Sequence, residues 1–100
     1  MSTTNNTEPV KHNSYFDGAV QSLALLTDKG KATVGVMKAG KYSFGTSTAE
    51  EMVVISGELS AKLPGGKWAI YLPQQSFSIA ANESFDVSCD TDVAYICYYE

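Results

Sequence analysis

The stretch from Gly40 to Gly57 reads GKYSFGTSTAEEMVVISG and contains the pattern that decides the fold. Tyr42 and Phe44 alternate with Ser43, and the continuous apolar run MVVI follows at 52–55. Alternation with a period of two is typical of a strand with one buried face, and a short apolar run is typical of a fully buried strand. Glycine near each end marks a turn. We therefore predict two strands in this stretch.

The same period of two continues on both sides of this stretch. Apolar residues alternate in short segments that are separated by turn sequences such as DKG, PGG and DTD; the segments lie at 32–36, 59–63, 68–72, 77–79 and 85–89. The last segment, VAYICYY at 93–99, is apolar on both faces and needs cover from two layers or from a second subunit. About eight short strands at this spacing predict an all-β sandwich or barrel. We favour a closed barrel, because an open sheet exposes its edge strands.

Length and composition predict one domain and exclude several classes of partner. The chain has 100 residues, a net charge of −4 and no arginine. We expect a flexible tail over residues 1–12 and one domain over 13–100. An acidic chain without basic patches is not expected to bind nucleic acid or an anionic membrane surface. Without a secretory or membrane-spanning segment, the expected location is the cytoplasm.

Two cysteines and one histidine offer little chemistry by themselves. Cys89 and Cys97 flank a turn and could form a disulfide, but in the cytoplasm we favour two buried free thiols. Two thiols alone do not make a zinc site. His12 lies at the end of the predicted tail, where we expect a solvated residue.

The spacing of the opening stretch resembles the first motif of the cupin family. That motif has a glycine, a five-residue spacer, two histidines separated by one residue, a glutamate, and a glycine seven residues after the glutamate. Gly40, Glu50 and Gly57 keep this spacing, but Thr46 and Thr48 stand where the histidines would bind metal. Because a metal site needs three or four converging ligands, we expect no metal here.

The counterpart of the second cupin motif is the segment 74–86, in which Asp86 falls near the position of the histidine. The two motifs together imply a single small cupin-type β-barrel of the jelly-roll, RmlC-like kind.

A more specific resemblance covers nearly the whole chain outside the tail. The run KATVGVMKAGKYSFGTSTAEEMVVISGELSAKLPG is similar to the family of cupin-like pyrimidine/purine nucleoside phosphorylases. The matching segments are Lys31–Met37, Gly40–Phe44, Thr46, Glu50–Met52 and Ile55–Gly57. One departure is Ala80-Ala81, where relatives can have Pro-Gly.

The resemblance implies a homodimer that converts a broad range of nucleosides and phosphate into free base and pentose 1-phosphate. It implies no cofactor, since inorganic phosphate is a co-substrate. Two alternatives stay open at this stage: a non-catalytic module that binds a nucleoside or sugar, and a metal-dependent cupin with oxygen ligands.

Phosphorolysis can use a carboxyl group near the sugar, and the adjacent Glu50 and Glu51 are the candidate catalytic residues. Such a group could bind ribose hydroxyls, oppose the positive charge of the oxocarbenium-like transition state, or protonate the base if its pKa is raised. Neighbours on a strand point to opposite faces, so we expect only one of them to face the pocket.

The phosphate must be held by lysine, hydroxyl or backbone N–H groups. The candidate phosphate-binding residues are Lys31, Lys41, Thr46 and Thr48. Lys31 matches a basic position of the family, and Thr46 takes a ligand position of the cupin motif.

The base and sugar need aromatic surfaces and adaptable polar groups. The candidates are Tyr42, Phe44, Asn82 and Asp86. An aromatic ring stacks on many bases, and an amide both donates and accepts hydrogen bonds, so these types suit purines and pyrimidines alike. Tyr15 and Phe16 are expected to form a lid or plug on the core.

Overall fold

The computed structural model describes residues 9–100, which form ten strands and one 3₁₀ turn. In chain order these are β1 (His12–Tyr15), η1 (Phe16–Gly18), β2 (Val20–Thr27), β3 (Gly30–Met37), β4 (Gly40–Gly45), β5 (Glu50–Ser56), β6 (Leu59–Lys62), β7 (Trp68–Tyr71), β8 (Ser76–Ile79), β9 (Ser84–Cys89) and β10 (Val93–Tyr99). No helix within this range is long and apolar enough to cross a membrane. Most of the predicted tail, residues 1–8, lies outside the described residues, and His12 begins β1.

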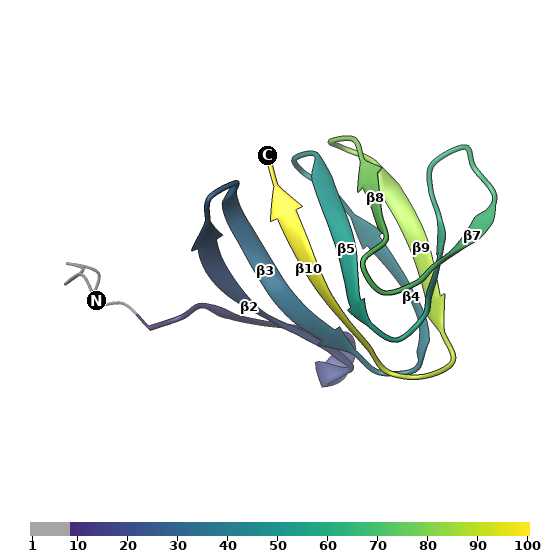
Figure 1. Ribbon diagram of the computed structural model, residues 1–100, viewed down its shortest axis with the longest axis horizontal. Coiled ribbons are helices and arrows are strands. Elements are labelled where there is room, and N and C mark those ends of the chain that lie inside the picture. The colour runs from purple at the N-terminus through teal and green to yellow at the C-terminus, as the bar shows by residue number, and fades with distance from the viewer. Residues whose placement is uncertain (1–8) are drawn as a thin grey trace.

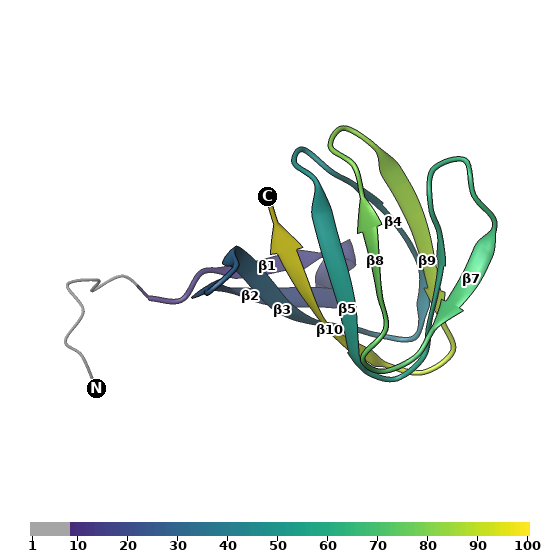
Figure 2. The same ribbon diagram turned by 45° about the horizontal axis from the view of Figure 1, so that its top comes forward.

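The strands form two antiparallel sheets that face each other (Figures 1 and 2). The larger sheet has the order β1-β2-β3-β10-β5-β8, and the smaller has the order β4-β9-β6-β7. The strand β10 lies between β3 and β5, at the centre of the larger sheet. The predicted all-β architecture is therefore confirmed.

The structure contains two strands, β1 and β2, that were not predicted from the sequence. The segment VQSLALLT forms β2, and residues 12–15 pair with it as β1. Its run Leu-Ala-Leu-Leu breaks the period of two, because the outward positions Leu23 and Leu25 are as apolar as the inward position Val20. A sheet face that stays apolar toward the outside hides the alternation that identifies a strand.

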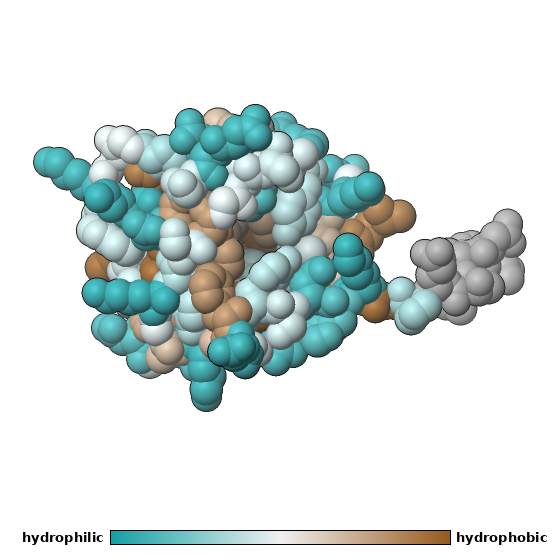
Figure 3. All heavy atoms as spheres, turned by 180° about the vertical axis from the view of Figure 1, so that it is seen from behind, coloured by the Kyte–Doolittle hydropathy of each residue, from teal (hydrophilic) through white to brown (hydrophobic). Residues whose placement is uncertain are grey.

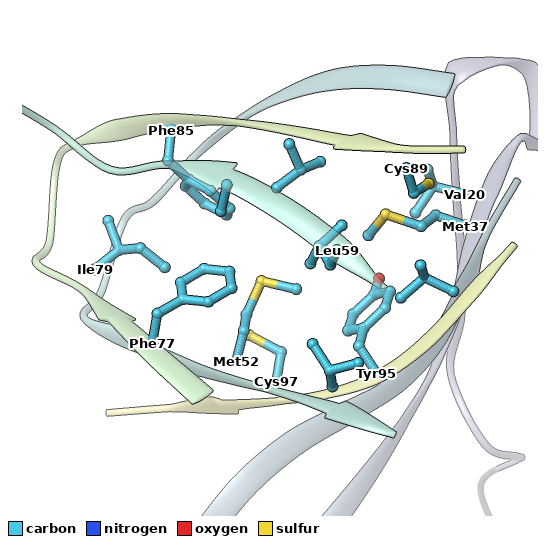
Figure 4. Packing of buried hydrophobic residues seen from close by; sticks show 14 residues of the cluster. Val20, Met37, Met52, Leu59, Phe77, Ile79, Phe85, Cys89, Tyr95 and Cys97 are labelled. Carbon is cyan, nitrogen blue, oxygen red and sulfur yellow. The ribbon is translucent and has the colours of Figure 1, made fainter. Parts of the chain in front are cut away.

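The hydrophobic core fills the space between the two sheets (Figure 4). Met52, Phe77 and Cys97 point into it from the larger sheet, and Leu59 and Phe85 point into it from the smaller one. Leu59 is completely buried. Inward residues follow one another at every second position, as a two-layer β-fold requires.

Three turns meet around Asp92 at one end of the two facing sheets. One carboxylate oxygen of Asp92 accepts a hydrogen bond from the Ala39 backbone N–H at 3.0 Å, and the other lies 3.8 Å from the Lys38 Nζ. The Asp92 carbonyl oxygen lies against Gly57, where a Cβ atom would be only 2.6 Å away. Gly57 also has a φ of +89°, a left-handed conformation that favours glycine. The last glycine of the opening stretch is therefore required by both space and backbone conformation.

Candidate functional site

A cavity of about 170 Å³ lies between the sheets, where β4, β5 and β10 come together. Its lining combines aromatic and apolar groups with hydroxyls, one thiol and one carboxyl group. The lining residues are Tyr15, Ser22, Met37, Phe44, Gly45, Glu50, Met52, Phe85, Tyr95, Cys97 and Tyr99. A mostly apolar lining with a few converging polar groups is typical of a ligand site.

Glu50 is the one carboxyl group in the lining of this cavity. It lies at the start of β5 on the inward face, in line with Met52 and Val54, and is half-buried. Burial raises the pKa of Glu50, and a hydrogen bond from the Cys97 thiol lowers it by less. Glu51 belongs to the opposite face of β5, where it pairs with Tyr98 and Ser78. The structure thus places only the first of the two adjacent glutamates in the cavity.

The last strand supplies three cavity residues that the sequence did not identify as site residues. Tyr95, Cys97 and Tyr99 occupy alternate inward positions of β10. The Cys97 Sγ donates a hydrogen bond to Glu50 Oε1 at 3.3 Å, and the Tyr99 hydroxyl lies 2.9 Å from Thr33 Oγ1. Burial raises the pKa of Tyr95 to about 12, so this hydroxyl keeps its proton and can donate a hydrogen bond.

The Tyr95 ring lies against Gly35, its partner in the β3–β10 pairing. A Cβ atom at Gly35 would come within 2.5 Å of the Tyr95 hydroxyl oxygen. The missing side chain therefore makes the space that the end of the tyrosine ring occupies. Tyr95 is only 7% exposed, so its ring cannot simply turn away from this position.

A larger groove of about 720 Å³ adjoins the cavity on the side of β1, β2 and β3. Tyr15 and Tyr99 line both the groove and the cavity. The groove also contains two lysines, Lys11 and Lys31. Of the four residues predicted to bind phosphate, Lys31 is the one that lines this groove.

Thr46 is buried, but its hydroxyl is used inside the fold. Thr46 Oγ1 donates to the Ala80 carbonyl oxygen at 2.7 Å and accepts from the Glu83 N–H at 3.0 Å. These bonds tie the end of β4 to the turn between β8 and β9. Thr46 is absent from the cavity lining, and Thr48 is exposed in the next loop.

Aromatic side chains lead from the surface into the cavity. Phe16, in η1, lies with its ring centroid 5.0 Å from that of Tyr42 and 5.5 Å from that of Phe44. Phe44 continues to Phe85 at 5.7 Å. Phe44 lines the cavity, whereas the Tyr42 hydroxyl donates to the Lys38 carbonyl oxygen at 2.7 Å. Phe16 thus covers the predicted aromatic pair.

The remaining predicted residues lie on the outside of the smaller sheet or in its turns. Lys41 and Asp86 occupy exposed positions that alternate with inward aromatic residues on β4 and β9. Asn82 is exposed in the turn before β9, with a φ of +60°. The period of two explains the positions of Lys41 and Asp86, because a residue next to an inward aromatic must point outward.

Other surface features surround the site. Seen from behind, the middle of the molecule is hollowed, and apolar atoms in the hollow are bordered by polar ones (Figure 3). Glu50 and Glu51 both line a further hollow with Lys29, whose Nζ lies 4.8 Å from the centre of the Tyr98 ring. Within residues 9–100, no three His, Cys, Asp or Glu side chains come together as metal ligands do.

The two facing sheets and the interior cavity define a cupin-type protein. The structure superimposes on an RmlC-like cupin from Shewanella frigidimarina with a TM-score of 0.71 at 15% identity, covering 97% of this chain and 88% of the other. At this identity the likeness shows the fold alone. The predicted small RmlC-like cupin fold is confirmed.

The family follows from closer similarities. Residues 10–99 match the model of the pyrimidine/purine nucleoside phosphorylase family, and the chain belongs to this family. A pyrimidine/purine nucleoside phosphorylase from Cellvibrio japonicus is 50% identical over 91 residues, which is 90% of this chain and 98% of the relative. A crystal structure of a protein of unknown function from Vibrio parahaemolyticus has a TM-score of 0.87 at 38% identity, covering 93% and 100% of the two chains.

Proposed function

We propose that this chain is a pyrimidine/purine nucleoside phosphorylase, which converts nucleosides and phosphate into free base and pentose 1-phosphate. The observation that carries the proposal is a half-buried carboxyl group, Glu50, in an interior cavity beside a groove that contains lysines. The family to which the chain belongs carries the same name over residues 10–99.

The sizes of the cavity and the groove suggest how a nucleoside and phosphate share the site. Small-molecule pockets usually have volumes of about 300–1,000 Å³. The cavity, at about 170 Å³, is smaller than this range, and the adjoining groove, at about 720 Å³, falls within it. We infer that part of the nucleoside enters the cavity, and that the rest lies between Tyr15 and Tyr99 or in the groove.

The reaction breaks the bond between the base nitrogen and the anomeric carbon while a phosphate oxygen bonds to that carbon. The bonding electrons leave with the base, which then takes up a proton. Glu50, whose raised pKa favours the protonated form, is proposed to supply this proton as a general acid. The hydroxyls of Ser22, Tyr95 and Tyr99 are proposed to bind the hydroxyls of the pentose, and Phe44 to stack on the base.

For phosphate we propose Lys31, since it lies in the groove next to the cavity and carries the positive charge that a phosphate dianion needs. Thr48 and Lys41 are exposed, and the Thr46 hydroxyl already has backbone partners. The geometry therefore supports Lys31 more than the other three predicted phosphate-binding residues.

The decisive test of the proposed function is whether base release depends on phosphate. We expect free uracil from uridine and free hypoxanthine from inosine only when phosphate is present, together with an equal amount of pentose 1-phosphate. Chromatography of the products measures all three compounds. Release without phosphate would indicate a hydrolase, and binding without any release would indicate a non-catalytic nucleoside-binding module.

We further propose that the chain forms a homodimer through the outer face of its larger sheet. An apolar row crosses four strands of this face: Leu23 pairs with Val34, Val34 with Ile96, and Ile96 with Val53. Leu23 is 51% exposed and Val34 is 39% exposed. Contiguous exposed apolar patches are typical of protein–protein interaction sites. A second copy is a suitable partner, because a two-fold axis brings the same uncharged row against itself.

Val34→Asp is expected to convert the dimer to a monomer, because the interface would then bury two unpaired carboxylates. Light scattering after size-exclusion chromatography measures the change from twice the mass of one chain to one. The matched control is Ile70→Asp on the exposed face of β7, which should stay dimeric. If Ile70→Asp were monomeric and Val34→Asp dimeric, the interface would lie on the smaller sheet instead.

A cytoplasmic location is also proposed. Cys89 and Cys97 are both buried free thiols, and free thiols are typical of reducing compartments. Fractionation of cells that express the chain would test the location.

A further inference from the structure

Among residues 9–100, Cys97 is the one side chain that hydrogen-bonds to the Glu50 carboxyl group. The Cys97 Sγ lies 3.3 Å from Glu50 Oε1. Cys97 is 3% exposed, and both residues line the cavity. In the β5–β10 pairing, Glu50 lies opposite Tyr99 and Met52 lies opposite Cys97, so the thiol reaches the carboxyl group diagonally across the two strands.

Two inward residues of β10 are tied to the neighbouring strands by their side chains. The Tyr99 hydroxyl lies 2.9 Å from Thr33 Oγ1 on β3, and the Cys97 thiol donates to Glu50 on β5. Every buried side-chain nitrogen and oxygen atom of the described residues has a hydrogen-bond partner. Satisfied hydrogen bonds of this kind fix the rotamers of the side chains that make them.

We propose that Cys97 is a positioning residue, which holds the Glu50 carboxyl group in its orientation toward the cavity by donating a hydrogen bond to it. The inference rests on the proposed function of Glu50 as the general acid. A general acid must lie within hydrogen-bonding distance of the atom that it protonates, and a small displacement of such a group costs a large factor in rate. Figure 4 shows Cys97 pointing from β10 into the space between the sheets.

The same hydrogen bond influences the titration of Glu50. The thiol donates to the carboxylate form, so loss of the thiol should raise the pKa of Glu50 further. The other titratable groups near Glu50 come from several elements. Tyr15, Tyr95 and Tyr99 line the cavity, and Lys29, Glu51, Tyr98 and Glu100 line the adjoining hollow.

The test compares three variants. Cys97→Ala removes the donor, Cys97→Ser keeps a hydroxyl donor of similar size, and Cys89→Ala removes the other buried thiol. Cys89 is a matched control, because it is 5% exposed and its thiol donates to the Lys38 carbonyl oxygen, away from the cavity lining. Thermal unfolding of each variant confirms that it folds.

Two readouts are measured for each variant. The first is kcat for uridine phosphorolysis across pH, and the second is the titration of the Glu50 carboxyl carbon by NMR, assigned by its absence in Glu50→Gln. We expect Cys97→Ala to lower kcat by roughly 10-fold to 100-fold, with KM nearly unchanged. It should also move the titration of Glu50 and the alkaline limb of kcat to higher pH. Cys97→Ser should restore part of kcat and part of the Glu50 titration. Cys89→Ala should change neither kcat nor the titration.

A Cys97→Ala variant with the titration and kcat of the wild type would overturn the proposal, and so would equal effects of Cys97→Ala and Cys89→Ala. The NMR titration needs no turnover. If the wild type releases no base with phosphate, the proposed function fails. A titration of Glu50 that shifts in Cys97→Ala but not in Cys89→Ala would still show that the Cys97 hydrogen bond lowers the pKa of Glu50.

Discussion

Glu50→Gln is expected to lower kcat for nucleoside phosphorolysis by about 100-fold or more, which is the usual cost of losing a general acid. Glutamine keeps the volume of the side chain and can still accept the hydrogen bond from Cys97. It cannot deliver a proton to the leaving base. Because the fold and the cavity are preserved, KM should change little. Initial rates with uridine at saturating phosphate measure both constants.

The pH dependence separates this role from a purely electrostatic one. Burial raises the pKa of Glu50, so the acid is protonated below that pKa and kcat should fall as the pH rises through it. The alkaline limb should be absent in Glu50→Gln. An exposed glutamate, Glu58, provides the control substitution Glu58→Gln. If Glu50→Gln turns over at the full rate while Glu51→Gln does not, the two adjacent glutamates have been assigned in the wrong order.

Gly57→Ala is expected to lower the free energy of unfolding by roughly 2–5 kcal/mol. A left-handed backbone costs a residue with a side chain about 1–2 kcal/mol, and φ at Gly57 is +89°. The new Cβ atom would also lie 2.6 Å from the Asp92 carbonyl oxygen, and overpacking of this kind costs about 1–3 kcal/mol. A small domain is stable by only about 5–15 kcal/mol, so this is a large share. Urea unfolding measures the change.

Gly65→Ala separates the cost of the left-handed backbone from the cost of the contact with Asp92. Gly65 has a φ of +71°, but a Cβ atom there would meet nothing within 4 Å. The free energy of unfolding of Gly65→Ala should therefore fall only by the backbone cost, about 1–2 kcal/mol. Equal losses in the two variants would show that contact with Asp92 adds nothing, and that the turns around Asp92 move apart to accept a methyl group.

Most of the fold could be predicted from the sequence because its strands show either alternation with a period of two or a short continuous apolar run. The alternation in GKYSFG and the apolar run MVVI correspond to β4 and to the middle of β5. The strand β2 could not be found in this way, since Leu23 and Leu25 make its outer face apolar. That same outer face is the surface proposed for the dimer. The apolar residues that hid β2 from sequence-based prediction are therefore also the residues proposed to contact the second copy.

The candidate site was predictable only where a motif fixed the register. Glu50 keeps the motif's spacing to Gly57, and the structure places it on the inward face of β5. Tyr95, Cys97 and Tyr99 were missed because VAYICYY is apolar on both faces, and its inward residues cannot be distinguished from core residues by pattern. Thr46 took the position of a metal ligand, but its neighbours in space are backbone groups that the sequence does not reveal.

The contact between Gly35 and Tyr95 also bears on how the central strands find their alignment. A slip of two residues between β3 and β10 would keep every side chain on its own face, so hydrophobic patterning alone does not forbid it. Such a slip would bring Tyr95 opposite Thr33 or Met37, whose side chains occupy the space that is empty at Gly35. The missing side chain at Gly35 therefore favours a single alignment of β3 and β10, in which Tyr95 lies opposite Gly35.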